Sequence, residues 1–110
     1  MERKFEFGHE RLDCYKLAVK VARWAAKQHI PAERKHLRGQ LLAAADSVPA
    51  NIAEGSGYEP GAQRRHHYRI AMGSAAEACS VLDVVDLPGG PEKQDELRRV
   101  GAMLLGMCRA

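Results

Sequence analysis

Aromatic residues are scarce in this chain, which has two Phe, three Tyr and one Trp among 110 residues. β-Strands are rich in aromatic and β-branched residues, whereas the apolar residues here are mostly Ala, Leu, Val and Met. No strand-like alternation of apolar and polar residues occurs either. The length is that of one small domain, so we expect a single all-α domain over residues 1–110.

Long apolar runs are also missing. No stretch approaches the ~20 apolar residues of a membrane-spanning helix, and the charged start, MERKFEFGHE, lacks the apolar segment of a secretory signal peptide. We therefore expect a cytoplasmic protein without a membrane partner.

The motifs of common enzyme classes are not present. The sequence has no GxGxxG, no P-loop, no Ser-His-Asp set and no zinc-ligand spacing. Its three cysteines, Cys14, Cys79 and Cys108, are far apart, and an odd number in a cytosolic chain is typical of free, buried thiols. None of these patterns indicates a catalytic site, and we expect no cofactor.

Two E-x-x-H patterns, at residues 6–9 and 33–36, leave a metal-binding bundle as the weakest hypothesis. This spacing is typical of di-iron sites in four-helix bundles. However, the first pattern precedes the first predicted helix, and Glu33 and Glu54 would lie about 31 Å apart along one helix. These carboxylates cannot hold one pair of metal ions.

Apolar residues recur at helical spacing in four segments. A proline after Ile30, the loop GSGYEPGAQ and the turn LPGGP separate them. Short connections between four helices predict an antiparallel up-down-up-down four-helix bundle. The predicted helices span about 9–28, 32–54, 61–87 and 91–108.

The first predicted helix carries two neighbouring apolar stripes. One consists of Leu12, Tyr15, Val19, Ala22 and Ala26. The other consists of Leu17, Val21, Trp24 and Ala25. Because a surface helix of a lone bundle needs only one stripe, we expect the second to contact another subunit of a homo-oligomer.

The stretch SVPANIAEG, residues 47–55, places Pro49 inside the second predicted helix. A proline there removes a backbone donor and crowds the carbonyl of Ala45. We expect a bend, because the apolar pattern continues past Pro49; the alternative is a stop and a restart with Ser47 as a cap. Gly55 and Gly57 then end the helix.

Small residues on the second and third helices predict a close approach between them. Gly73 in particular costs about 1 kcal/mol relative to Ala in mid-helix, and such a glycine usually admits another backbone. Asn51, Ser74 and Glu77 are candidates for an internal polar network, the alternative being that Glu77 faces water. Glu54 and Glu77 are also conceivable as paired carboxylates, although no acid–base partner accompanies them.

Positive charge is unevenly distributed. The net charge is +3, but residues 1–40 hold ten Lys/Arg against five Asp/Glu, and residues 41–110 hold seven against nine. Two basic clusters stand out: Lys16, Lys20, Arg23 and Lys27 along the first helix, and Arg64, Arg65 and Arg69 in the third. Each is either an ordinary solvated face or a nucleic-acid-binding surface. In a ring, each cluster would be repeated and become multivalent.

Three runs of the sequence, LDCYKLAVKVA, QLLAAADSVPANIAEG and YRIAMGSAAEA, resemble a known family. It comprises small proteins encoded within intervening sequences of bacterial 23S rRNA genes, and the accessory variability proteins of diversity-generating retroelements look similar. The last predicted helix matches only in length and character. The residues that we assign to the structural motif are Ser47, Pro49, Asn51, Glu54, Gly55, Gly73, Ser74 and Glu77.

The resemblance implies an antiparallel four-helix bundle that assembles into a ring, commonly a pentamer, and has no enzymatic activity. For the retroelement relatives it implies a basic surface that engages nucleic acid and a reverse transcriptase. Our leading hypothesis is therefore a non-enzymatic oligomeric scaffold that binds RNA, DNA or a reverse-transcriptase-like protein. The alternative is a protein-interaction scaffold without a nucleic-acid role.

Overall fold

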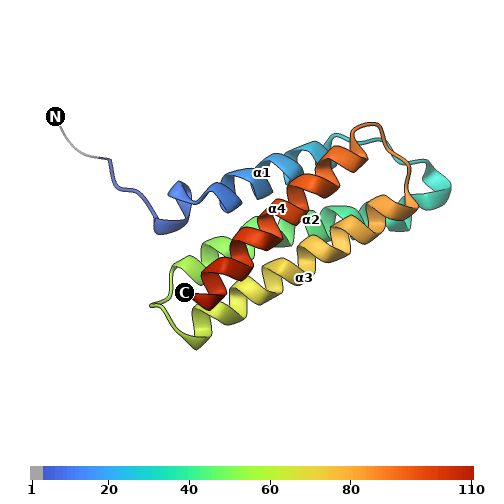
Figure 1. Ribbon diagram of the computed structural model, residues 1–110. Helices are drawn as coiled ribbons and strands as arrows, with labels where there is room; N and C mark the ends of the chain where they lie inside the picture. The colour runs from blue at the N-terminus through green and yellow to red at the C-terminus, as the bar shows by residue number, and fades with distance from the viewer. Residues whose placement is uncertain (1–3) are drawn as a thin grey trace.

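Four α-helices follow a short arm in the computed structural model, which describes residues 4–110. Consecutive helices run in opposite directions and pack side by side, and the last packs back against the first (Figure 1). The prediction of an all-α four-helix bundle is confirmed, although the first three residues of the predicted domain lie outside the described part. The helices are α1 (Asp13–Ala26), α2 (Lys35–Ser56), α3 (Ala62–Val84) and α4 (Gly90–Arg109).

The helix ends differ from the predicted ones where the backbone becomes extended. Leu12 has φ −74° and ψ 126°, so the predicted start of the first helix is a separate 3-10 turn, η1 (Gly8–Arg11). A second turn, η2 (Ala32–Arg34), precedes α2. Val85, with φ −102° and ψ 114°, ends α3 three residues before the predicted end at Leu87.

Each helix contributes one side to a common apolar core. Complete burial of a Val, Leu or Ile side chain stabilises a fold by roughly 1.5–3 kcal/mol, so these positions dominate the stability of the bundle. The larger side chains with less than 2% exposure are Val21 of α1, Leu41, Val48 and Ile52 of α2, and Leu97, Val100 and Leu104 of α4.

The second apolar stripe of α1 packs mainly inside the subunit. Val21 and Ala25 are 1% and 2% exposed and belong to the core, whereas Leu17 and Trp24 are half-buried against it. The expectation that this stripe is left for another subunit is therefore wrong for its two buried members. The reason is that α1 packs against both α2 and α4, which cover two of its faces.

α2 passes through Pro49 without a break. The alternative of a stop and restart at Ser47 is therefore wrong, and the helix ends at Ser56 with Gly57 as its C-cap, close to the expected stop. The hydroxyl of Ser47 does not cap a helix; it accepts hydrogen bonds from Asn51 Nδ2 at 3.0 Å and from Ser74 Oγ at 2.8 Å.

A polar seam joins α2 to α3 and contains the predicted Asn51–Ser74 network. Ser47, Asn51 and Gly55 are four residues apart and share one face of α2. Asn51 Oδ1 also lies 3.2 Å from Nδ1 of His67. We define the α2–α3 seam by its contacting residues, Ser47, Asn51, Gly55, Ser56, His67, Tyr68 and Ser74.

Of two further predictions about this seam, the alternative in which Glu77 faces water is confirmed, and the close approach at Gly73 is wrong. Glu77 is exposed, because it stands one residue before the buried Ala78 and so points about 100° away from the core. Gly73 is also exposed, and a Cβ added to it would meet nothing within 4 Å. It therefore permits no close approach within the subunit.

The close approach occurs at Gly55 instead. A Cβ there would lie 2.9 Å from two ring carbons of Tyr68 and 3.0 Å from the Cβ of His67. Tyr68 is 2% exposed, and its hydroxyl shares a hydrogen bond of 2.8 Å with Ser56 Oγ. The missing side chain thus makes room for a fixed aromatic ring, rather than for a second backbone.

Candidate nucleic-acid interface

The four predicted cations of α1 line one side of a hollow between α1 and the start of α4. Its volume is about 400 Å³. All four are exposed, and the residues of the 4–110 range that line this hollow include no carboxylate. We define the basic groove by the residues that line it: Lys16, Val19, Lys20, Arg23, Trp24, Lys27 and Lys93.

A second hollow continues the groove toward the C-terminal half of α4. It measures about 360 Å³ and shares Lys16 and Lys20 with the basic groove. Arg99 adds a further cation, and Asp13 is its one carboxylate. The positively charged surface therefore extends along the α1–α4 boundary.

Two of the cations are fixed by one buried carboxylate. Glu96 Oε1 accepts a hydrogen bond of 2.6 Å from Lys93 Nζ, and Glu96 Oε2 lies 2.8 Å from Lys20 Nζ. Glu96 and Lys93 are 5% and 7% exposed. Because one carboxylate faces two ammonium groups, the set keeps a positive charge, with Lys93 buried at the floor of the groove and Lys20 exposed above it.

The pKa values of this set follow from the same contacts. Burial by itself would raise the pKa of Glu96, but the hydrogen bonds and charges of Lys20 and Lys93 outweigh burial and lower it. The hydrogen bond and the charge of Glu96 raise the pKa of Lys20. Glu96 and Lys20 are therefore ionised at neutral pH.

The sequence analysis missed Lys93 and Glu96, although their spacing carries a signal. Each precedes a buried residue of α4, Leu97 or Val100, by four positions. Residues four apart share a helix face, so a cation and an acid in register with the core stripe indicate a buried pair.

Trp24 forms the aromatic part of the basic groove. It is half-buried and lies beside Gly89 in the turn before α4, where a Cβ would be 3.5 Å from the indole Nε1. Gly89 has φ 83°, in the left-handed region that favours glycine. The turn thus supports one edge of the indole beside the lysines.

The second predicted cluster, on α3, has a different environment. Arg64 Nη2 donates hydrogen bonds to the carbonyls of Tyr58 at 2.5 Å and Ser56 at 3.4 Å, at the C-terminal end of α2. A cation there complements the helix dipole, which gives Arg64 a structural role. Arg65 is half-buried and Arg69 is exposed.

The structure does not join the two basic clusters into one surface. α1 packs against α2 and α4, whereas α3 packs against the other sides of the same two helices. α1 and α3 therefore lie at opposite corners of the bundle (Figure 1). In the described part of the chain, the α1 cluster lines a hollow together with Lys93, whereas Arg64 of the α3 cluster lines a separate hollow with Tyr68 and Met107.

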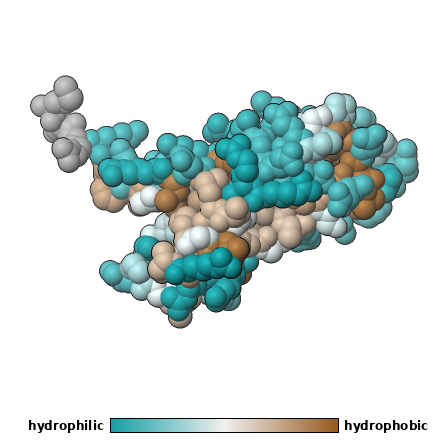
Figure 2. All heavy atoms as spheres, viewed as in Figure 1, coloured by the Kyte–Doolittle hydropathy of each residue, from teal (hydrophilic) through white to brown (hydrophobic). Residues whose placement is uncertain are grey.

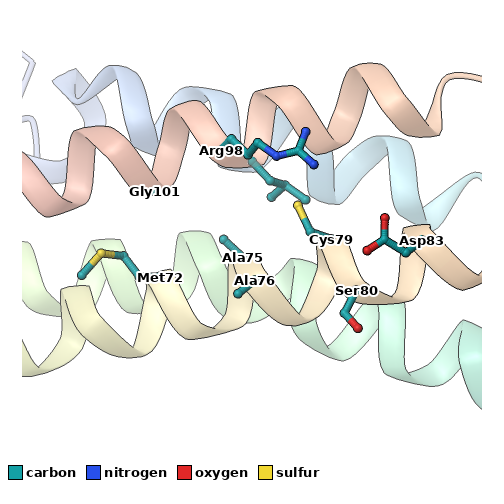
Figure 3. A pocket seen from close by; sticks show the side chains of 9 residues that line it. Met72, Ala75, Ala76, Cys79, Ser80, Asp83, Arg98 and Gly101 are labelled. Atoms are coloured by element: carbon teal, nitrogen blue, oxygen red, sulfur yellow. The ribbon is translucent and has the colours of Figure 1, made fainter.

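A groove between α3 and α4 is mainly apolar. It has a volume of about 350 Å³ and is lined along much of its length by Met72, Ala75, Ala76, Leu97 and Gly101. Figure 3 shows Cys79, Asp83 and Arg98 gathered toward one end, away from Met72. This is the α3–α4 groove.

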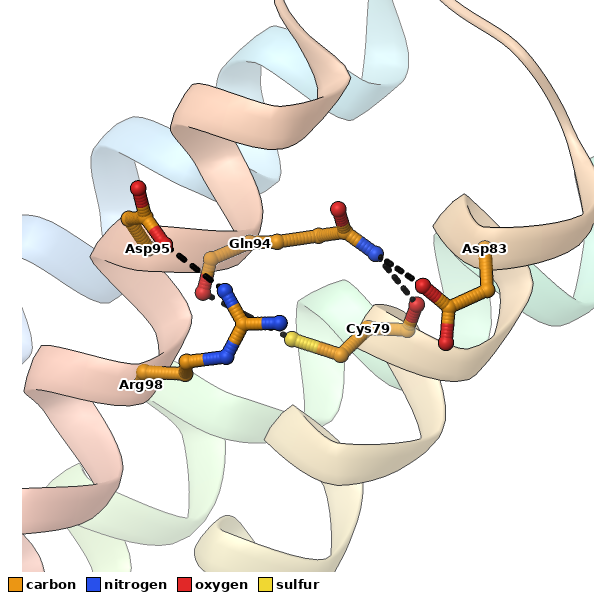
Figure 4. A network of polar contacts seen from close by, with 5 residues as sticks. All are labelled: Cys79, Asp83, Gln94, Asp95 and Arg98. Atoms are coloured by element: carbon orange, nitrogen blue, oxygen red, sulfur yellow. Dashed lines mark hydrogen bonds and ion pairs between the residues drawn. The ribbon is translucent and has the colours of Figure 1, made fainter.

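Polar groups at that end satisfy one another. Gln94 Nε2 donates to the carbonyl of Cys79 at 3.0 Å and to Asp83 Oδ1 at 2.8 Å, while Arg98 pairs with Asp95 at 2.7 Å (Figure 4). Burial raises the pKa of the Cys79 thiol, so the nucleophilic thiolate is disfavoured at neutral pH. The groove is better suited to packing than to chemistry.

The cysteines, the possible metal ligands and the apolar content of the helices were also subjects of prediction. The three cysteines are free, as predicted, although only Cys14 is fully buried. Among residues 4–110, no three side chains of His, Cys, Asp or Glu converge on a possible metal site. None of the helices described is both long and apolar enough to cross a bilayer.

Comparison with known proteins identifies the family. The search of curated proteins finds no match. Residues 10–98 match the family model described as 23S rRNA-intervening sequence protein, a range that includes the α2–α3 seam, all of α1 and the Lys93–Glu96 pair. The chain therefore belongs to the 23S rRNA-intervening sequence protein family.

Proposed function

We propose that this protein is a non-enzymatic binding protein whose basic groove holds nucleic acid. The observation that carries the proposal is a hollow whose lining, in the part of the chain that the structure describes, has five cationic side chains and no carboxylate. Glu96 neutralises part of that charge from beneath, and the rest faces solvent. A concave surface with one sign of charge attracts a polyanion more strongly than scattered lysines do.

The spacing of the cations fits a chain of phosphates. Lys16 and Lys27 are eleven positions apart on α1, which is about 16 Å along the helix axis. Such a length spans several phosphates of a nucleic-acid strand, and each contact releases a bound counterion. Glu96 pairs with Lys20 and Lys93, so the groove has one exposed cation and one buried cation held by the same carboxylate before binding.

Charge reversal on α1 tests this proposal. Arg23→Glu combined with Lys27→Glu should weaken binding to RNA or DNA at least roughly tenfold at low salt, since two attractive contacts become repulsive. The wild-type log–log dependence of affinity on salt should have a slope of roughly −3 for four phosphate contacts, and the variant a shallower one. Fluorescence anisotropy of a labelled oligonucleotide gives both quantities.

Two further double variants serve as controls. Lys35→Glu with Arg38→Glu changes the charge equally on exposed positions of α2 outside the groove, and it should have a small effect. Arg65→Glu with Arg69→Glu measures the contribution of the α3 cluster. Equal losses in all three variants, or a wild-type affinity that ignores salt, would contradict binding in the basic groove.

We also propose that copies of the chain assemble through the outer surface of α3 and α4. On α3, Ile70 and Val84 are 38% and 55% exposed and Gly73 is open, and on α4 Leu105 is 42% exposed. Figure 2 shows apolar residues in the hollow between the polar edges of these helices. From the family resemblance we expect a ring, with a pentamer favoured, which would repeat the basic groove around it.

Light scattering coupled to size exclusion tests the assembly. The wild-type protein should elute as an oligomer, and Ile70→Glu combined with Val84→Glu should elute as a folded monomer, because two charges replace apolar contacts. A wild-type monomer at micromolar concentration would rule out the assembly. A protein that itself handles nucleic acid, such as a reverse-transcriptase-like enzyme, is a further partner to test by pull-down before and after nuclease treatment.

A further inference from the structure

The basic groove contains an aromatic ring as well as cations. Trp24 is the single tryptophan of the chain and lines the hollow with Lys20, Arg23 and Lys27. One edge of its indole is supported by the turn at Gly89, where a Cβ would lie 3.5 Å from Nε1. The ring therefore has a fixed position within reach of whatever the lysines bind.

We propose that the groove is specific for single-stranded nucleic acid, with one unstacked base packed on Trp24 and the flanking phosphates on the α1 cations. This inference rests on the proposed function and names the form of nucleic acid that the groove binds. A cation-lined groove with an aromatic side chain is the arrangement by which proteins bind single strands without reading sequence, since every base has a face that stacks.

A duplex does not suit the same surface. Its bases are already stacked on one another and paired, so a base reaches Trp24 only if it is first flipped out, which costs free energy. The duplex phosphates can still contact the lysines, so a duplex binds through electrostatic contacts but without stacking on Trp24. A free single strand offers its phosphates to the lysines and a base to the indole at the same time. Its bases can turn toward the indole at little cost in free energy.

A mononucleotide is the other ligand with a base beside a phosphate. It would reach Trp24 and one or two cations, whereas Lys16 and Lys27 lie about 16 Å apart along the helix axis and require a longer ligand to be used together. An oligonucleotide should therefore bind far more tightly than a mononucleotide of the same base.

The single tryptophan makes a direct test possible with the full chain. The probes are a twelve-nucleotide single strand of deoxythymidine, a duplex of the same length and thymidine monophosphate, each titrated at low salt. We expect the single strand to quench Trp24 emission and to bind roughly tenfold more tightly than the duplex. Thymidine monophosphate should bind weakly.

Variants separate stacking from charge. Trp24→Leu should lower single-strand affinity roughly tenfold and leave duplex affinity unchanged, while Trp24→Phe should keep part of the preference, because a smaller ring still stacks. Tyr58→Leu removes an exposed aromatic ring outside the groove and should change neither affinity. Circular dichroism and the anisotropy of a labelled strand show whether each variant is folded and what it binds.

The outcomes distinguish this inference from the proposed function. Equal affinity for single strand and duplex, binding without quenching, or a mononucleotide as tight as the oligonucleotide would overturn the inference and leave a nucleic-acid surface in place. Absence of binding by every probe at low salt would overturn both. If Trp24→Leu instead changes the oligomeric state, the indole contacts another subunit and the inference fails.

Discussion

The two polar boundaries of this bundle are built in opposite ways. In the α2–α3 seam, short side chains form hydrogen bonds of 2.8–3.2 Å with one another across the helix pair, as Ser47, Ser74, Asn51 and His67 do. Along the α1–α4 boundary, long cationic side chains lie over one carboxylate and face outward. In the α2–α3 seam the polar groups hydrogen-bond to one another. Along the α1–α4 boundary, positive charge remains available to a ligand.

This difference separates the residues that hold two helices together from those that can bind. The runs that carry the resemblance place Ser47, Asn51, Gly55 and Ser74 in the seam, where they hold two helices together. The exposed cations of α1 are not needed for that packing.

Removing the carboxylate under the groove should have the largest effect on stability. Glu96→Ala leaves Lys93 buried without a counter-charge, and we expect a loss of about 3 kcal/mol in the free energy of unfolding. Urea denaturation at pH 7 measures it. The double variant Lys93→Met, Glu96→Leu replaces the pair by apolar groups and should recover most of the loss; an undiminished loss would show that the pair is not the cause.

The second-largest effect on stability should come from adding one methyl group in the α2–α3 seam. Gly55→Ala places a Cβ 2.9 Å from the fixed ring of Tyr68, and we expect a net loss of about 1–2 kcal/mol in unfolding free energy after the gain in helix propensity. Gly73→Ala, on an open surface of α3, should instead raise the unfolding free energy of the subunit by up to about 1 kcal/mol. If both substitutions shift the melting temperature in the same direction, Gly55 is not the point of close approach between α2 and α3.

The smallest effect should be a difference in pH dependence. The contacts of Glu96 lower its pKa in the folded state below the ordinary 4.5, so its contribution to stability is full above that value. The contribution is lost as the pH falls through the lowered pKa. Wild-type protein should therefore be more stable than Glu96→Gln at neutral pH, and the gap between their urea midpoints should narrow toward pH 3. A gap that is constant with pH would contradict this role.

Local patterns in the sequence predicted the helices because periodicity and breakers act over a few residues. The predicted fourth helix, 91–108, agrees with Gly90–Arg109, and the four α1 cations do lie along one side of the groove. The predicted first helix began too early, because Leu12 is extended between a 3-10 turn and α1. The spacing of apolar residues alone does not distinguish a 3-10 turn from the first turn of an α-helix.

Contacts between helices were harder to predict. Composition suggested Gly73 as the point of close approach, but Gly55 holds that place, because the deciding factor is the ring of Tyr68 on the facing helix. His67 takes the position in the polar network that Glu77 was a candidate for. Which side chain completes a network depends on the rotation of one helix against another, and that is set by the packing of the whole core.

The amino-acid sequence by itself determined that this chain forms four helices and carries a line of cations on the first, since both follow from residues three and four positions apart. Only the tertiary structure decided that Lys93 meets that line in one hollow with Glu96 paired to it, while the arginines of α3 face the opposite corner. The physical reason is that a binding surface joins segments about seventy positions apart, and their juxtaposition exists only once the core has fixed how α4 returns to α1.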